Sequence, residues 1–165
     1  MRRWLGAAVV VMAGPCLAQE AERVSAAFTW TSLELATVEI GDGREAYARE
    51  RVVVATEETQ GPLAGLQGRC LMQGTRDRNA GSFAATGVCV HVDADGDRLV
   101  TEVTEGVENR HTLVEGTGTW TDGTGKFLGA SGEFRYSLVS FGLQPPGRGE
   151  GTGRLDGTWL TETAN

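Results

Sequence analysis

The stretch GTGTWTDGTGKFLGASGEF, residues 116–134, decides the fold of this chain. Its GTGK segment looks like a phosphate-binding loop, but the positions around it do not match one. A P-loop has a glycine five positions before the glycine that precedes the lysine, and Ser or Thr directly after the lysine. Trp120 and Phe127 occupy those positions here. A dinucleotide-binding fingerprint fails too, because Leu128 stands where its third glycine belongs. We therefore expect these glycines to serve the architecture of the chain.

The same glycines recur at short spacing beside large aromatic residues, which favours a narrow barrel. Glycine within a strand lets a barrel wall bend sharply or leaves room for a bulky neighbour. Small residues opposite large ones fill the taper of such a barrel. We expect Phe127 to anchor the core after a tight turn, and Lys126 to be a solvated turn residue. The glycines are Gly116, Gly118, Gly123, Gly125, Gly129, Gly132, Gly151, Gly153 and Gly157, and the aromatic residues are Trp120, Phe127, Phe134, Tyr136 and Trp159.

Short runs rich in Val, Thr and aromatic residues alternate with Gly, Asp and Asn over the rest of the chain, as in antiparallel sheets. Eight or nine such strands with short connections suit a sandwich or a barrel, and closure removes exposed edges. We predict an all-β fold, a single antiparallel closed barrel of about eight strands with at most a short helical turn near 125–130. The expected strands are 24–32, 33–41, 45–56, 66–74, 82–92, 98–106, 109–120, 132–141 and 151–162.

The first twenty residues, MRRWLGAAVVVMAGPCLAQE, have the form of a signal peptide. Two arginines precede an apolar run that is much shorter than the roughly 20 residues of a membrane-spanning helix. Small residues end at Ala18, where a signal peptidase would cut. We predict a signal peptide over 1–18 and one barrel domain over 19–165. The arginine-rich, lysine-poor composition favours a Gram-negative bacterium, so the expected location is periplasmic or secreted.

Two alternatives to simple cleavage stay open. A lipoprotein signal needs a cysteine at the cut, and Cys16 is present, but Pro15 stands where Gly, Ala or Ser is usual. The segment could also be retained as an anchor.

The charge balance excludes several partners. The chain carries 15 basic and 22 acidic residues, a net charge of −7, and loss of the two arginines of the signal peptide makes it −9. Such an acidic protein is repelled by nucleic acid and by anionic lipid. We expect no nucleic-acid partner, and no membrane partner after cleavage.

Cleavage would leave Cys70 and Cys89 as the only cysteines. The polar, turn-forming segment 77–81 contains the midpoint between them, so antiparallel pairing around it would bring the two cysteines opposite each other. In an exported chain this predicts a disulfide, which would stabilise the fold by about 3 kcal/mol. A reactive thiol is the alternative, but it would need a nearby base that the sequence does not identify.

The segment DADGD places Asp93, Asp95 and Asp97 at alternate positions. Clustered carboxylates can bind calcium, and these three match the first three ligands of an EF-hand loop. Thr104, however, stands at the twelfth position, where a bidentate glutamate is needed. The three aspartates are a calcium candidate, and the alternative is an Asp-Gly hairpin turn with solvated acids.

The two histidines, His91 and His111, stand in strands without a second ligand or base at a diagnostic spacing. We interpret both as structural or solvent-facing. The sequence contains no GxSxG, HExxH or CxxC motif, so we assign no catalytic residue, no metal site beyond the calcium candidate and no cofactor.

Two segments carry a family resemblance. GTGTWTDGTGKFLGASGEFRY resembles the strand-turn-strand segment of allene oxide cyclase barrel-like proteins, a superfamily whose barrel plant dirigent proteins share. GVCVHVDADGDRLVTEVTEG resembles a segment of small exported bacterial proteins of unassigned function. The resemblance covers roughly residues 66–160. It implies an eight-stranded barrel with a central cavity, often trimeric. Cyclases of the superfamily use a polar cavity group and a bound water, but none of their catalytic residues can be matched here.

We therefore expect an exported barrel that binds a small, mostly apolar ligand or a partner without catalysis. An isomerase or cyclase that acts inside the cavity is the first alternative, because such catalysis needs little more than shape and one polar group. A structural barrel packed solid with side chains is the second.

Overall fold

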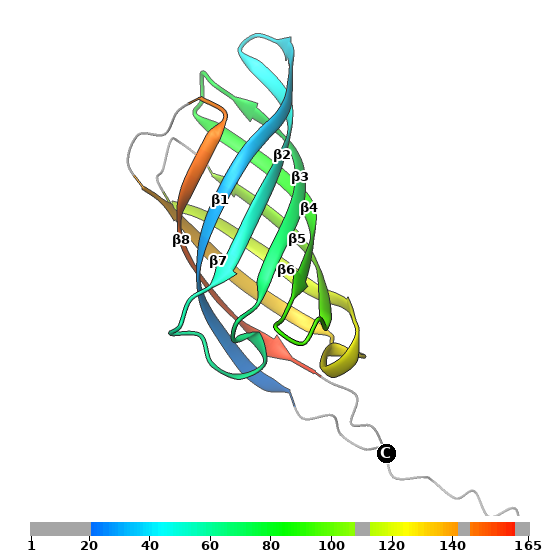
Figure 1. The fold of residues 1–165 in the computed structure, drawn as a ribbon. Helices are drawn as coiled ribbons and strands as arrows, with labels where there is room; N and C mark the ends of the chain where they lie inside the picture. Colours follow the sequence, from blue (N-terminus) through cyan, green and yellow to red (C-terminus); the bar gives the residue numbers. More distant parts are fainter. Residues whose placement is uncertain (1–20, 108–112, 142–145, 161–165) are drawn as a thin grey trace, which may run out of the picture.

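The computed structural model describes residues 21–107, 113–141 and 146–160, which form a closed antiparallel barrel. The predicted fold class is confirmed, because every strand pairs with its neighbours in the chain and the first strand pairs with the last (Figure 1). Two single 3₁₀ turns, η1 (Gly61–Leu63) and η2 (Gly125–Phe127), are the helical segments of the described residues. The strands are β1 (Glu22–Gly41), β2 (Arg44–Ala55), β3 (Gln67–Asp77), β4 (Ser82–Val92), β5 (Arg98–Val107), β6 (Leu113–Gly123), β7 (Gly132–Ser140) and β8 (Arg148–Trp159).

One expectation about the strands is wrong. The segments 24–32 and 33–41 form one continuous strand, β1, because no turn-forming residue separates them. The pairing of β1 with β8 ends at Leu33, and the register of β1 against β2 shifts just beyond it, between Glu34 and Ala36. The remainder of β1 pairs with β2 alone, and the two form the long hairpin at the top of Figure 1.

The barrel is plugged at the end where β1 begins and β8 ends. Leu63 and Leu66, in and beside η1, and Phe127 of η2 are buried there, and the Phe127 ring meets Trp159 edge-on with centroids 5.9 Å apart. Phe127 is thus the core anchor that the sequence predicted. We call Leu63, Leu66 and Phe127 the plug. Among the described residues, no helix is long and apolar enough to cross a membrane.

Glycines of β6 make room for aromatic rings of β7. A Cβ atom at Gly118 would lie 2.2 Å from the Phe134 ring, and one at Gly116 would lie 2.3 Å from the Tyr136 ring. Real Cβ atoms do not approach that closely, so the rings turn into the lumen only because these positions are glycine. The glycines of the 116–134 stretch therefore serve the architecture, as expected.

The Cys70–Cys89 disulfide is present, with the two residues directly opposite each other on β3 and β4. Both cysteines are buried and belong to the hydrophobic core. The predicted pairing is confirmed.

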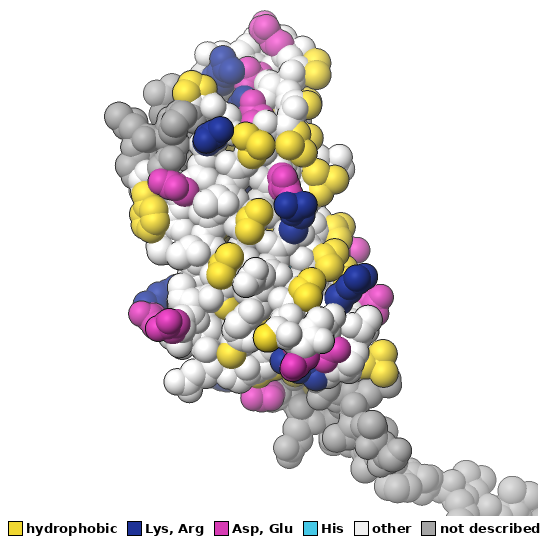
Figure 2. Space-filling view, viewed as in Figure 1, with side chains coloured by type: hydrophobic (Ala, Val, Ile, Leu, Met, Phe, Trp, Pro, Cys, Tyr) yellow, Lys and Arg dark blue, Asp and Glu magenta, His cyan; other side chains and the backbone are white. Residues whose placement is uncertain are grey.

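The outer surface mixes charged and hydrophobic side chains (Figure 2). Exposed hydrophobic residues of neighbouring strands include Leu71, which is 62% exposed, and Val88, its partner across the β3–β4 pair. Val90 and Val92 continue the row along β4.

Candidate functional site

One strand contributes an alternating row of polar side chains to the barrel lumen. In the β2 segment EAYARER, Glu45, Tyr47, Arg49 and Arg51 are two residues apart, so they share one face of the strand. Arg49 and Arg51 both contact Glu105 of β5, a strand that is not paired with β2. Such contacts can form only across the lumen, so this face of β2 points inward.

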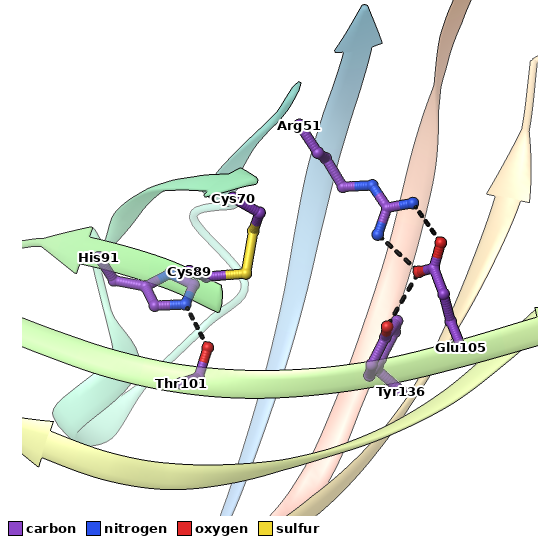
Figure 3. The surroundings of a disulfide bond; sticks show 7 residues. All are labelled: Arg51, Cys70, Cys89, His91, Thr101, Glu105 and Tyr136. Carbon is purple, nitrogen blue, oxygen red and sulfur yellow. Dashed lines mark hydrogen bonds and ion pairs between the residues drawn. A yellow bond between two sulfur atoms is a disulfide. The ribbon is translucent and has the colours of Figure 1, made fainter. Parts of the chain in front are cut away.

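Glu105 is the centre of a buried polar cluster (Figure 3). Its carboxylate accepts two hydrogen bonds from Arg51, from Nη1 at 2.7 Å and from Nη2 at 2.8 Å. The Tyr136 hydroxyl donates a third at 2.9 Å, and Arg49 Nη2 also pairs with the carboxylate. The Glu105 side chain has no exposed surface. We call Arg49, Arg51, Glu105 and Tyr136 the lumen cluster.

The protonation states within the lumen cluster follow from burial and pairing. Burial opposes ionisation of Glu105, but the hydrogen bonds and charge of Arg51, with the charge of Arg49, leave its pKa below the usual value. Burial and the nearby Glu105 charge raise the pKa of Tyr136. Glu105 is therefore an anion, and Tyr136 is a neutral donor, across the whole neutral range.

A second group of ion pairs lies nearer the end of the barrel opposite the plug. Arg76 Nη1 lies 2.7 Å from the Glu34 carboxylate, and Arg76 also pairs with Glu45. Arg78 pairs with Glu45 as well. Two arginines and two glutamates make this group neutral. It borders a hollow of about 500 Å³ at the rim, which we call the rim hollow. Arg76 and Phe83 line it, together with Thr75 and Ala84 from the outward side of their strands.

Below the lumen cluster, toward the plug, lies an apolar cavity of about 80 Å³. Arg51 and Tyr136 are among its lining residues, together with the Cys70–Cys89 disulfide. A water needs about 10–15 Å³, and an engineered cavity of about 150 Å³ holds benzene. The cavity therefore has room for a few waters or for part of a small ligand, such as a short alkyl group.

His91 also lines the cavity. Its Nε2 lies within hydrogen-bonding distance, 3.2 Å, of the Thr101 hydroxyl (Figure 3). Burial lowers the pKa of His91 to about 4, so the imidazole is neutral at physiological pH. His91 is thus a partly buried, neutral side chain, and His111 lies outside the described residues.

The three aspartates of the calcium candidate lie in the β4–β5 turn. The Asp93 carboxylate accepts hydrogen bonds from the backbone N–H groups of Asp95 and Asp97, both at 2.9 Å. Its other oxygen lies 2.7 Å from the ammonium group of Lys126, and Asp97 accepts the Lys126 backbone N–H at 3.0 Å. In the described part of the chain, no three His, Cys, Asp or Glu side chains converge as metal ligands. Calcium binding by this turn stays a prediction, whereas Lys126 has an ion-pair partner that the sequence did not suggest.

Sequence reasoning missed the lumen cluster. The signal that could have found it is the alternation in EAYARER, where the polar row alternates with Ala46, Ala48 and Glu50. A strand with that pattern is normally read with its charged face outward. Only the contact with Glu105, 54 residues further along the chain from Arg51, identifies the row as internal.

Comparison with known proteins supports the fold alone. No protein-family model matches the chain, and no curated protein matches it. Among solved structures, that of the pterocarpan synthase dirigent protein is similar, with a TM-score of 0.54 and 11% sequence identity. The match covers 94% of this chain and 100% of that one. This chain therefore has a dirigent-like eight-stranded barrel, the class of fold that the resemblance in its sequence implied.

Proposed function

We propose that this chain is a binding protein whose barrel lumen holds a small, mostly apolar organic molecule without chemical change. The observation that carries this proposal is the apolar cavity bounded by the lumen cluster on one side and by the disulfide and His91 on the other. Pockets for small ligands combine apolar walls with a few placed polar groups, and this cavity has that composition.

The ionisable groups around the cavity favour binding over catalysis. A general acid or base works best when its pKa lies near the operating pH. Glu105 is held as an anion by Arg51, the pKa of Tyr136 is raised, and the pKa of His91 is lowered to about 4. Each group is therefore far from exchanging a proton at neutral pH.

A cyclase or isomerase is the second candidate. The Tyr136 hydroxyl, hydrogen-bonded to Glu105 beside the cavity, is the kind of polar group that could steer a reactive molecule held by shape. The similar solved structure is that of a pterocarpan synthase dirigent protein, and its name supports this candidate. Turnover of a bound compound, rather than its recovery unchanged, would favour it.

The test of ligand binding is native mass spectrometry of the purified protein, followed by identification of any released molecule. A Val103→Phe variant fills the cavity wall, and Val139→Phe places the same ring on the outer surface as a control. We expect an adduct on the wild type and on Val139→Phe but not on Val103→Phe. Equal adducts on all three proteins would place the ligand elsewhere and overturn the proposal.

We also infer that the chain is exported and loses residues 1–18. A disulfide persists in oxidising compartments, and the Cys70–Cys89 bond supports such a location. The mass of the protein recovered from the periplasm of a bacterial host should correspond to a chain that begins at Gln19. A full-length mass, or a lipid-modified Cys16, would contradict cleavage after Ala18.

A homotrimer is our proposal for the oligomeric state, on the resemblance to allene oxide cyclase barrel-like proteins. The exposed hydrophobic row of Leu71, Val88, Val90 and Val92 on β3 and β4 is a surface that a second copy could cover. Light scattering after size-exclusion chromatography measures the mass directly, and a monomer at micromolar concentration would contradict the proposal.

A further inference from the structure

Among the residues that the structure describes, the ion pairs of the lumen include one more positive than negative charge. The lumen cluster combines Arg49 and Arg51 with the single carboxylate of Glu105. The group near the rim hollow adds two arginines and two glutamates, so it leaves the balance unchanged. In a chain with a net charge of −7, an internal excess of positive charge is opposite in sign to the molecule as a whole. Buried charges are normally paired, so this excess of positive charge favours the binding of an anion.

Arg49 is the cation whose charge is less fully compensated by the carboxylate that it shares with Arg51. Glu105 gives both carboxylate oxygens to the two terminal nitrogens of Arg51, and its charge and hydrogen bonds raise the pKa of Arg51 despite burial. Burial and the charge of Arg51 lower the pKa of Arg49, so the shared carboxylate does not fully offset them. The Arg49 side chain is 20% exposed, against 5% for Arg51, so it is also the more accessible of the two.

Two aromatic rings hold the Arg49 guanidinium. Its central carbon lies 5.4 Å from the centroid of the Tyr47 ring and 5.5 Å from that of the Phe83 ring. Phe83 also lines the rim hollow, and the Arg76 guanidinium lies over the other ring, Tyr47, at 5.4 Å. Cation–π contacts of this kind fix the orientation of the guanidinium without using its N–H donors. The two rings therefore position the Arg49 guanidinium and leave its N–H donors for other partners.

Three donors on the inward face of β2 have no acceptor within the described residues. They are the Tyr47 hydroxyl, Arg49 Nε and Arg51 Nε, all buried. The Tyr47 side chain is only 7% exposed, and burial raises its pKa, so the hydroxyl is a neutral donor. Buried donors without an acceptor are rare, because each missing hydrogen bond costs the free energy of taking the donor out of water. An acceptor that also carries negative charge would satisfy the donors and the charge balance together.

We propose that Tyr47, Arg49 and Arg51 form an acid-recognition site in the lumen, which binds the carboxylate of a small organic acid. This proposal rests on the proposed function, since the apolar part of the same ligand would lie against Phe83 and Tyr47 or in the cavity below. The charge selects a carboxylate over an alcohol or amide of the same shape. The aromatic walls select an organic acid over an inorganic anion.

The test compares acids with amides of matched shape. Isothermal titration calorimetry with butanoate and hexanoate, against butanamide and hexanamide, measures the contribution of the charge. We expect each acid to bind at least about tenfold more tightly than its amide, the size of effect typical of a charged hydrogen bond. Potassium chloride serves as the inorganic arm and should bind at least about tenfold more weakly than hexanoate.

Variants locate the site. Arg49→Gln should bring the affinity for hexanoate down to that for hexanamide and leave the amide unaffected, because only the charge is removed. This variant should fold, since Glu105 keeps Arg51 and Tyr136 as partners. Tyr47→Phe is a second variant and should lower the affinity for hexanoate by about threefold to tenfold. Arg154→Gln, at an exposed position of β8, is the matched control and should change nothing.

Each outcome has a definite meaning. Equal affinity for acid and amide in the wild type overturns the acid-recognition site but leaves lumen binding intact. Chloride that binds as tightly as hexanoate overturns it too, because an adventitious inorganic anion would then suffice. A preference for acids that survives Arg49→Gln and Tyr47→Phe places the site elsewhere. No binding of any of the four organic probes counts against both this site and the proposed function.

Discussion

Replacement of Glu105 by Gln is the sharpest test of the lumen cluster. Gln keeps the shape of the side chain but removes the charge that Arg49 and Arg51 share. Arg51 would then stay buried, and Arg49 partly buried, without a counter-ion, and loss of one partner of a buried ion pair typically costs about 3–5 kcal/mol. For a domain of this size, about 2–4 °C of melting temperature is lost per kcal/mol, so the expected fall is about 6–20 °C.

Urea unfolding followed by tryptophan fluorescence measures this loss, because Trp30, Trp120 and Trp159 are buried in the fold. Glu102→Gln is the matched control, since Glu102 is three positions earlier on the same strand but is exposed. It should stay within about 0.5 kcal/mol of the wild type.

A double variant tests the cause. If the cost arises from unpaired buried cations, then Glu105→Gln should cost less by about 1 kcal/mol or more when Arg49 is already Gln. A loss below about 1 kcal/mol for Glu105→Gln alone, or an identical loss in both backgrounds, would refute the reasoning. The first result would mean that the arginines find water or other partners.

The other predictions concern the walls of the lumen. The pKa of His91 is about 4 in the folded state, against about 6.5 in the unfolded chain. Between these two pH values the unfolded chain binds a proton that the folded chain does not. The stability should therefore fall by about 3 kcal/mol as the pH drops from about 6.5 to 4. His91→Gln should reduce that slope in urea unfolding measured from pH 7 to 4, and an unchanged slope would contradict the burial of His91. Replacement of both Cys70 and Cys89 by Ala should cost about 3 kcal/mol at neutral pH, with free thiols absent from the wild type by thiol titration. Gly118→Ala should lose at least about 1–3 kcal/mol in thermal unfolding, because the new methyl group meets the Phe134 ring, and a neutral effect would show that the ring can move aside.

The sequence predicted the barrel because its signals are local. Alternation within strands, turn residues between them, and the spacing of Cys70 and Cys89 about a polar turn each depend on residues close together in the chain. The one error in the strands, the division of 24–41 into two, arose because a bulge needs no turn residue and leaves little trace in the pattern.

The candidate site could not be predicted in the same way. The pairing of Arg51 with Glu105 depends on two strands that face each other across the lumen, and nothing local relates them. The space at Gly118 and Gly116 sets the orientations of the Phe134 and Tyr136 rings. The apolar cavity is the volume that these rings leave unfilled. Such a volume follows from three-dimensional packing rather than from any motif.

The pairing of the first strand with the last also constrains how the molecule is made. Glu22 pairs with Trp159, so the wall stays open until nearly the whole described chain is available. The disulfide cannot substitute for this closure, because it joins β3 to its immediate neighbour β4 and leaves the seam to hydrogen bonds and packing. A chain that is interrupted before β8 would keep two unpaired strand edges, at β1 and β7, which invite association with other chains. Completion of synthesis is therefore a precondition for closing the barrel, and truncation near the C-terminal strand is a route to aggregation rather than to a smaller barrel.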